Sequence, residues 1–74
     1  MVHLTKRLKD LREDHDETQR DIAALLKLPP QRISEWEKGF HEPRLEILIS
    51  LADHWNVSLD YLCGLTSNPR HFRR

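Results

Sequence analysis

The sequence predicts a small all-α domain built from five short helices, and three observations support this prediction. Apolar residues recur at helical spacing, and no alternation typical of a strand is sustained. The length of 74 residues allows one domain with a modest core, which argues against an enzyme with a deep enclosed pocket. Residues that break helices are few, and they are Gly39, Gly64, Pro29, Pro30, Pro43 and Pro69.

An acidic run separates the first two predicted helices. The first helix is expected over residues 4–14, and its apolar face holds Leu4, Leu8 and Leu11. The acidic run over residues 13–17 opposes the helix dipole, so the helix is expected to end there. Thr18 and Asp21 form a capping-box-like pattern, which predicts that the second helix begins at this point.

A proline pair separates the second helix from the third. Pro29 and Pro30 stop the second helix, because proline disfavours helical geometry in the residue before it. Pro30 also suits the first turn of a new helix, where its missing N–H costs nothing. The third helix is therefore expected from Pro30 to Lys38, and Gly39 suits the left-handed position that follows a helix.

Two further helices and a tail complete the predicted organisation. A fourth helix is expected over residues 44–55, and Asn56 can close it in a left-handed conformation. Ser58 caps a short fifth helix that runs through Leu62. The domain is expected to cover residues 1–66, followed by a basic C-terminal tail over residues 67–74.

Composition points to an intracellular protein without catalytic or metal chemistry. The single cysteine, Cys63, can form no internal disulfide and is expected to be a small filler beside the last helix. No basic segment followed by an apolar run opens the chain, and no apolar run approaches the roughly 18 residues of a membrane span. The histidines share no ligand spacing and no catalytic constellation occurs. We therefore expect a cytoplasmic protein that is not an enzyme, with no metal, cofactor or small-molecule ligand.

The segment over residues 19–36 has the form of a helix-turn-helix. Apolar side chains lie on both helices and at the turn, and Ala23 provides the small residue needed where the two backbones approach. Further pieces extend the pattern: Thr18-Gln19-x-x-Ile22-Ala23, Leu28-x-x-x-x-Ile33-Ser34-x-Trp36-Glu37-x-Gly39, Pro43-x-Leu45-Glu46-x-Leu48, Leu51-Ala52 and Val57-Ser58-Leu59-Asp60-x-Leu62-x-Gly64. In this order the pieces resemble the Cro/cI-type (XRE-like) helix-turn-helix family over residues 4–65. The resemblance implies a five-helix, lambda-repressor-like DNA-binding domain whose third helix enters the major groove.

The resemblance also implies which residues face DNA. Base edges would be met by Pro30, Gln31, Arg32, Ser34 and Glu35. Gln31 can pair with adenine, Glu35 can accept from the amine of cytosine, and Pro30 can offer only an apolar contact such as one to a thymine methyl. Arg32 could read guanine or hold a phosphate. Phosphates would be contacted by Thr18, Gln19, Lys27, Lys38, His41 and Arg44.

One expected ion pair and four departures complete the comparison with the family pattern. Arg12 and Glu37 stand where the family often joins its first and third helices by an ion pair. The departures are Lys27 in place of a turn glycine, Pro29 in place of a Ser or Thr cap, Glu17 in place of an apolar residue, and Arg44 in place of a Ser or Asp cap. A left-handed Lys27 would cost stability, and the two missing caps remove capping oxygens.

A palindromic DNA site calls for a dimer, and the C-terminal apolar residues offer two possibilities. Trp36, near Ile33 on the inner face, is expected in the core. The C-terminal residues could complete that core or form a dimer patch, and the patch is favoured because such residues anchor interfaces. The proposed patch consists of Trp55, Leu59, Tyr61, Leu62 and Leu65.

The function expected from these patterns is sequence-specific binding of double-stranded DNA by a small homodimeric transcriptional regulator, a repressor of bacterial or phage origin. The alternative is a protein-interaction module that kept the fold without reading DNA. The formal net charge of zero, the Pro29-Pro30 pair and Glu35 motivate this alternative. The charge is uneven, however, because residues 13–17 carry −4 and residues 18–44 carry +1. Screening leaves only local potential effective over about 8–10 Å, so we expect weak non-specific DNA affinity rather than none.

Overall fold

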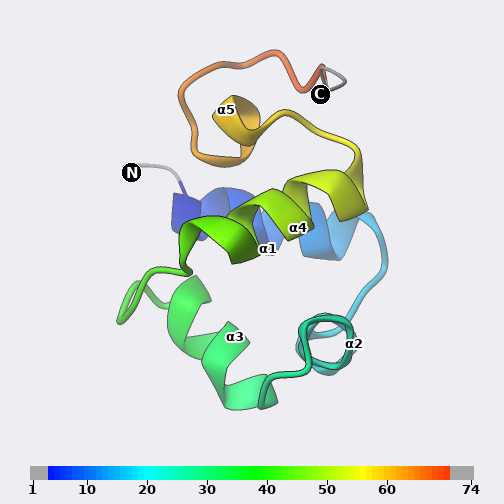
Figure 1. The fold of residues 1–74 in the computed structure, drawn as a ribbon, viewed down its shortest axis with the longest axis vertical. Coiled ribbons are helices and arrows are strands. Elements are labelled where there is room, and N and C mark those ends of the chain that lie inside the picture. The colour runs from blue at the N-terminus through cyan, green and yellow to red at the C-terminus, as the bar shows by residue number, and fades with distance from the viewer. Residues whose placement is uncertain (1–3, 71–74) are drawn as a thin grey trace.

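Five helices organise residues 4–70, which are the residues that the computed structural model describes. They are α1 (Leu4–Asp14), α2 (Gln19–Leu26), α3 (Pro30–Glu37), α4 (Leu45–Trp55) and α5 (Leu59–Leu62). In Figure 1, α1 and α4 lie across the middle, α2 and α3 form one end, and α5 lies at the other. Residues 4–70 contain no strand. The predicted all-α, five-helix fold is confirmed.

Side-chain caps set the starts of two helices, as the sequence predicted. The Thr18 hydroxyl accepts from the Asp21 N–H at 3.0 Å, and the Asp21 carboxylate accepts from the Thr18 N–H at 2.9 Å. This reciprocal capping box begins α2. The Ser58 hydroxyl accepts from the Tyr61 N–H at 3.0 Å and caps α5. Pro29 and Arg44, which precede α3 and α4, make no side-chain capping bond.

Left-handed residues close α2 and α4. Lys27 has φ 58° and ψ 45°, and Asn56 has φ 55° and ψ 45°. Asparagine adopts this conformation more readily than lysine does, because its short polar side chain can bond locally. The N–H of Leu28 then donates to the carbonyl of Ala23 at 2.9 Å, which gives a hydrogen-bond partner to one of the last carbonyl groups of α2. The turn between α2 and α3 therefore has the shape that glycine usually provides, with a lysine in it.

The core joins all five helices around fully enclosed side chains of Ile22, Leu51 and Leu62. Trp36 lies in this core as expected, with 4% of its surface exposed. Cys63 is also buried. Burial, and secondarily the charge of Asp60, raises the pKa of the Cys63 thiol, so little reactive thiolate is present at neutral pH.

The burial of two aromatic and aliphatic residues corrects the predicted dimer patch. Trp55 is 4% exposed and Leu62 is 0% exposed, so both belong to the core rather than to a surface patch. The reason is that α5 folds back against α1 and α4 and encloses these side chains. Of the remaining members, Leu59 and Tyr61 are partly buried and Leu65 is 74% exposed. Arg7 lies over the Tyr61 ring, 4.0 Å from its centre.

The segment after α5 folds onto the domain. The Ser58 N–H donates to the Pro69 carbonyl at 3.1 Å, and Arg7 Nη1 donates to the Thr66 carbonyl at 3.4 Å. This packing extends beyond residue 66, where the tail was expected to begin. The described chain ends on the α5 side, away from α2 and α3 (Figure 1). The last four residues of the predicted basic tail, 71–74, lie outside the described residues.

Candidate nucleic-acid interface

Helix α3 turns one face to the core and the other to solvent. Ile33 and Trp36 are its buried residues, and they pack with Ile22 and Ala23 of α2 in the core. The opposite face carries the predicted base readers, of which Pro30, Gln31 and Arg32 are exposed and Ser34 and Glu35 are partly exposed. The side chains of Gln31 and Glu35 lie one turn apart, with Gln31 Nε2 3.4 Å from Glu35 Oε2. A short helix with a free polar face has the dimensions that the major groove admits.

The start of α2 presents N–H donors beside Gln19. The first N–H groups of a helix have no intrahelical partner, and the helix dipole favours an anion there. The Gln19 side chain donates from Nε2 to Glu37 Oε1 at 3.0 Å. An amide NH₂ group has two hydrogens, so this bond orients the group and leaves the second hydrogen available. Thr18 uses its hydroxyl oxygen and its N–H in the capping box.

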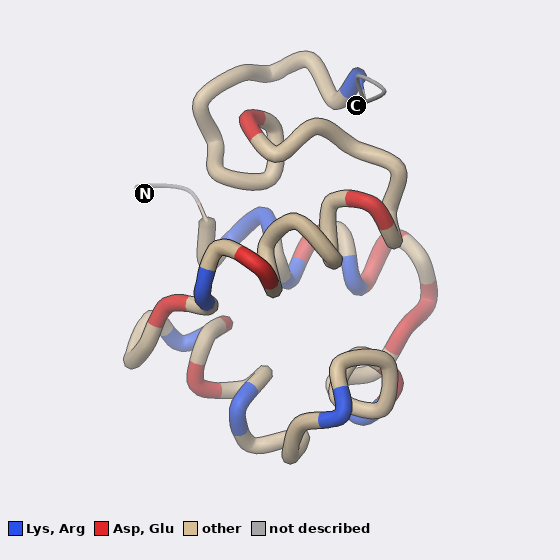
Figure 2. The backbone as a smooth tube through the Cα atoms, viewed as in Figure 1, with Lys and Arg blue, Asp and Glu red and all other residues tan. Residues whose placement is uncertain are grey.

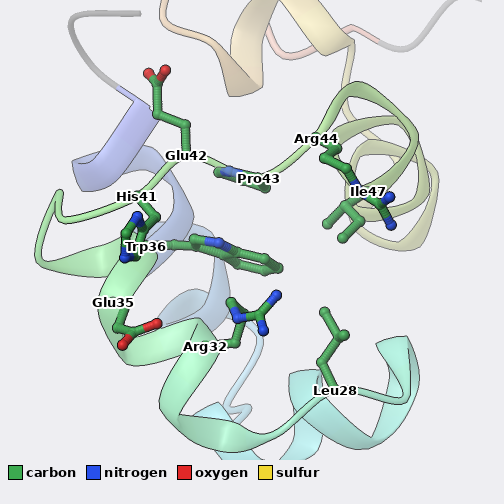
Figure 3. Close-up of a pocket in the computed structure, with 9 residues that line it drawn as sticks. All are labelled: Leu28, Arg32, Glu35, Trp36, His41, Glu42, Pro43, Arg44 and Ile47. Atoms are coloured by element: carbon green, nitrogen blue, oxygen red, sulfur yellow. The ribbon is translucent and has the colours of Figure 1, made fainter.

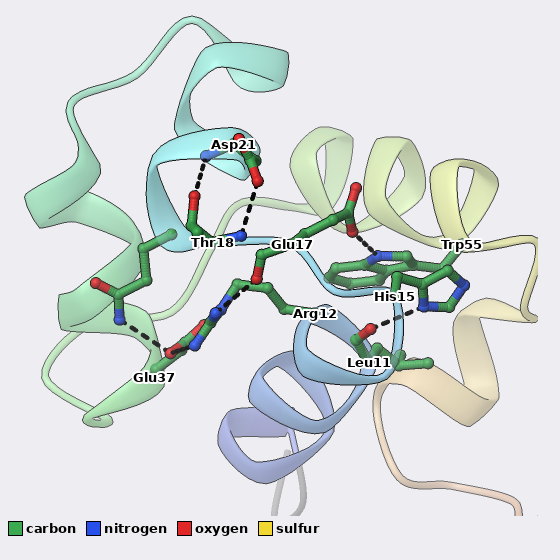
Figure 4. A network of polar contacts seen from close by, with 9 residues as sticks. Leu11, Arg12, His15, Glu17, Thr18, Asp21, Glu37 and Trp55 are labelled. Atoms are coloured by element: carbon green, nitrogen blue, oxygen red, sulfur yellow. Dashed lines mark hydrogen bonds and ion pairs between the residues drawn. The ribbon is translucent and has the colours of Figure 1, made fainter.

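The ion pair expected between the first and third helices is present and nearly enclosed. Arg12 Nε lies 2.7 Å from Glu37 Oε2, and Arg12 Nη2 lies 3.1 Å from Glu37 Oε1 (Figure 4). The two side chains are 12% and 6% exposed. The hydrogen bond to Glu37 raises the pKa of Arg12 despite the opposing effect of burial. Glu37, the last residue of α3, thus accepts hydrogen bonds from Arg12 of α1 and from Gln19 of α2. Sequence reasoning did not predict that Gln19 contacts Glu37.

A second polar contact joins the α1–α2 connection to the end of α4. Glu17 Oε1 accepts from the indole Nε1 of Trp55 at 2.8 Å, and Glu17 Oε2 lies 2.6 Å from His54 Nε2. Burial raises the pKa of Glu17, but the hydrogen bonds from Trp55 and His54 and the nearby His54 and His15 outweigh it. The net pKa of Glu17 is below its ordinary value. Sequence reasoning interpreted Glu17 as part of the acidic run that ends the first helix and as a lost apolar contact, although a buried tryptophan N–H ordinarily needs an acceptor.

A hollow separates α3 from the start of α4. It has a volume of about 350 Å³, and Trp36 is one of the residues that line it. Figure 3 shows Arg32 projecting from α3 and Arg44 from the residue before α4, with Ile47 near Arg44. The other residues that line it are Leu28, Glu35, His41, Glu42 and Pro43. Two arginines and a histidine at one hollow favour an anion in this place, although two carboxylates share it.

Exposed basic residues lie at both ends of α3. Lys27 stands in the turn before the helix and Lys38 follows its last residue, while His41 and Arg44 lie on the segment that leads into α4; all four are exposed. Figure 2 shows basic segments on the turn between α2 and α3 and within α3, whereas a run of acidic residues occupies the α1–α2 connection. Cations that flank an exposed polar helix suit a backbone on which phosphates lie to either side of a groove.

Comparisons with known proteins agree with this geometry. A family model described as helix-turn-helix matches residues 8–62. The HTH-type transcriptional regulator ImmR of Bacillus subtilis (strain 168) is 36% identical over 63 residues, which are 85% of this chain and 50% of that regulator. The HTH-type transcriptional regulator YobD of the same strain is 33% identical over 64 residues, which are 86% of this chain and 57% of that protein. The chain spans about half the length of these curated relatives, and no solved structure matches it.

Proposed function

Because the chain belongs to the helix-turn-helix family, we propose that it binds double-stranded DNA in a sequence-specific manner and regulates transcription. The observation that carries the proposal is the exposed polar face of α3, flanked by basic residues at both of its ends. In this role α3 enters the major groove while the start of α2 and the segment before α4 contact the phosphates. A protein in this role is expected to lie in the cytoplasm, where the DNA that it binds is found.

Each predicted base reader has a definite chemical preference. Gln31 offers an amide that pairs with adenine, and Glu35 accepts from the exocyclic amine of cytosine. Pro30 at the start of α3 can only make an apolar contact, such as one to a thymine methyl. The Ser34 hydroxyl can donate to or accept from a base edge, and Arg32 pairs with guanine or with a phosphate. The phosphate contacts, which set orientation rather than sequence, come from Thr18, Gln19, Lys27, Lys38, His41 and Arg44.

We further propose that two copies act together on a palindromic site and repress the genes beside it. The surface that supports this is the α5 end, where Leu65 is exposed and Leu59 and Tyr61 are partly buried. Aromatic and aliphatic side chains of this kind anchor interfaces. The test is sedimentation of the protein and of Leu65→Lys: we expect a dimer in the first and a monomer in the second, with helical content unchanged. A wild-type monomer at every concentration, alone and on DNA, contradicts the dimer.

The first experiment on function is selection from a random duplex library at low salt, followed by a salt titration on the enriched sequence. We expect a palindrome whose affinity falls steeply as salt rises, because each neutralised phosphate releases counterions. Failure to enrich any sequence, with helical circular dichroism intact, contradicts the proposed function.

Variants then separate the DNA face from the fold. Gln31→Ala combined with Arg32→Ala is expected to abolish selective binding while circular dichroism and thermal unfolding stay unchanged, since both side chains are exposed. Lys9→Ala, which removes an exposed charge from α1, is the matched control and is expected to bind nearly normally. A folded double variant with unaltered DNA affinity favours a protein-interaction module instead.

A further inference from the structure

Glu17 is placed to control where α2 begins. It directly precedes Thr18, the residue that caps α2. Its carboxylate reaches across to the last turn of α4, where it accepts from Trp55 Nε1 at 2.8 Å and lies 2.6 Å from His54 Nε2. With 21% of the side chain exposed, this carboxylate is held rather than free in solvent.

The main chain of Glu17 is held as firmly as its side chain. Its N–H donates to the Arg12 carbonyl at 3.0 Å, and its own carbonyl accepts from Arg12 Nη1 at 2.8 Å (Figure 4). The same guanidinium binds Glu37 at the end of α3. Glu17 therefore connects the start of α2 to α4 through its side chain and to α1 and α3 through Arg12.

The residues that follow Glu17 are those expected to meet phosphates. Thr18 is its immediate neighbour, and Gln19 comes next with its amide oriented by Glu37 at 3.0 Å. Because hydrogen bonds weaken steeply away from ideal distance and angle, a small displacement of this turn weakens any bond to a phosphate.

We propose that Glu17 is a positioning residue for DNA binding, whose bonds to Trp55 and His54 fix the start of α2 and thereby the phosphate contacts of Thr18 and Gln19. The inference rests on the proposed function and adds a residue that faces α4 rather than DNA.

The sign of the mutational effect distinguishes positioning from simple electrostatics. Removing a negative charge near DNA tightens binding if charge alone matters, because like charges repel. Positioning predicts the opposite: Glu17→Ala weakens binding about tenfold, the effect of losing one charge-assisted hydrogen bond to a phosphate. Asp16→Asn is the matched control, since it removes the same charge one residue away at an exposed site with φ 56°, which asparagine tolerates.

Two conservative variants test the individual bonds. Trp55→Phe keeps an aromatic ring in the core and leaves the net charge unchanged, but it removes the N–H that donates to Glu17, together with part of the indole ring. We expect it to weaken DNA binding in the same direction as Glu17→Ala. Glu17→Gln keeps an oxygen that can accept from Trp55, so it is expected to retain most of the affinity. Trp55→Phe also keeps the inference testable if Glu17→Ala fails to fold.

The decisive measurement uses duplexes of the selected sequence, and of an unrelated sequence, with a neutral methylphosphonate at one phosphate at a time. Affinities are compared at a temperature where circular dichroism shows every variant folded. For wild type, a methylphosphonate at the phosphate that α2 contacts is expected to lower the affinity. For Glu17→Ala, the same replacement is expected to leave the affinity unchanged. Equal or tighter binding by Glu17→Ala, with that sensitivity retained, overturns the inference. Absence of wild-type binding to every duplex instead contradicts the proposed function, and with it the inference.

Discussion

At the scale of single residues, Lys27 is the position where stability and the proposed function conflict. Its φ of 58° lies in the left-handed region, which costs a residue with a Cβ atom about 1–2 kcal/mol. Glycine avoids this cost but loses about 0.5–1 kcal/mol of backbone entropy on folding. A lysine at this turn is therefore easier to explain by a contact with DNA than by the fold.

We expect Lys27→Gly to stabilise the domain by about 0.5–1 kcal/mol and to weaken DNA binding, because the strain is relieved while a phosphate contact is lost. Urea unfolding gives the first quantity and a binding titration the second. The control Lys27→Asn keeps a residue that tolerates the left-handed region but carries no charge, and it is expected to weaken binding similarly. Undiminished DNA affinity in both variants contradicts the phosphate role of Lys27.

At the scale of elements, α4 begins without the cap that helices usually have. Arg44 occupies the capping position with extended backbone geometry, φ −68° and ψ 161°, and its side chain makes no capping hydrogen bond. Its side chain is 81% exposed and lies 3.8 Å from Glu46. Such an exposed ion pair contributes little to stability, so the arginine does little for the helix that it precedes.

Arg44→Ser is expected to stabilise α4 by about 1 kcal/mol, because a serine oxygen accepts from the first-turn N–H groups. The same change is expected to weaken DNA binding and to lower the dependence of log affinity on log salt by about one unit, since one cation contact is lost. Arg44→Ala separates the two effects, as it removes the cation without adding a cap. A rise in melting temperature with unchanged salt dependence contradicts the phosphate role of Arg44.

At the scale of the whole molecule, two polar clusters join helices that the apolar core alone does not orient. Arg12 and Glu37 connect α1 to α3, and Glu17 connects the α1–α2 turn to α4. Both clusters surround the start of α2, which is the proposed phosphate-binding turn. The relative positions of the helices therefore depend on these largely enclosed polar contacts as well as on the apolar core.

Removing one partner of the Arg12–Glu37 ion pair is expected to lower the free energy of unfolding by more than the intact pair contributes to it, because the remaining charge loses its partner. Glu37→Ala strands the Arg12 charge and should lower the free energy of unfolding by about 3–5 kcal/mol. Replacing both residues, as in Arg12→Met with Glu37→Leu, is expected to recover part of that loss, because no buried charge is left unpaired. Chemical unfolding of the single and double variants measures the difference. A double variant that is no more stable than Glu37→Ala contradicts this account.

The lowered pKa of Glu17 predicts how stability changes with pH. A carboxyl group whose pKa is lower in the folded state stabilises that state above its ordinary value of 4.5 and loses this contribution as pH falls through the folded value. The free energy of unfolding should therefore decrease on acidification below about pH 4.5. Glu17→Gln has no carboxyl group at this position and lacks this pH-dependent contribution. The difference in free energy of unfolding between wild type and Glu17→Gln should therefore decrease as pH falls. A difference between wild type and Glu17→Gln that stays constant as pH falls contradicts the prediction.

Local sequence patterns are sufficient to predict the helices and which face of each helix is buried. Thr18 with Asp21, the proline pair at 29 and 30, and Asn56 act within a few residues of chain, so their effect does not depend on how the helices pack. Helical periodicity likewise determined that Ile33 and Trp36 face inward. The opposite face of α3, which carries the proposed base readers, follows from the same periodicity.

The burial of the C-terminal residues and the contacts between distant polar groups depend on how the helices pack. Trp55 and Leu62 are core residues because α5 folds back on α1 and α4, a packing that periodicity in so short a helix does not specify. The bonds of Gln19 to Glu37 and of Trp55 to Glu17 join residues 18 and 38 positions apart. Their existence depends on where the helices cross. Local patterns set what each helix is, whereas the positions of the groups around α2 are a property of the packed molecule.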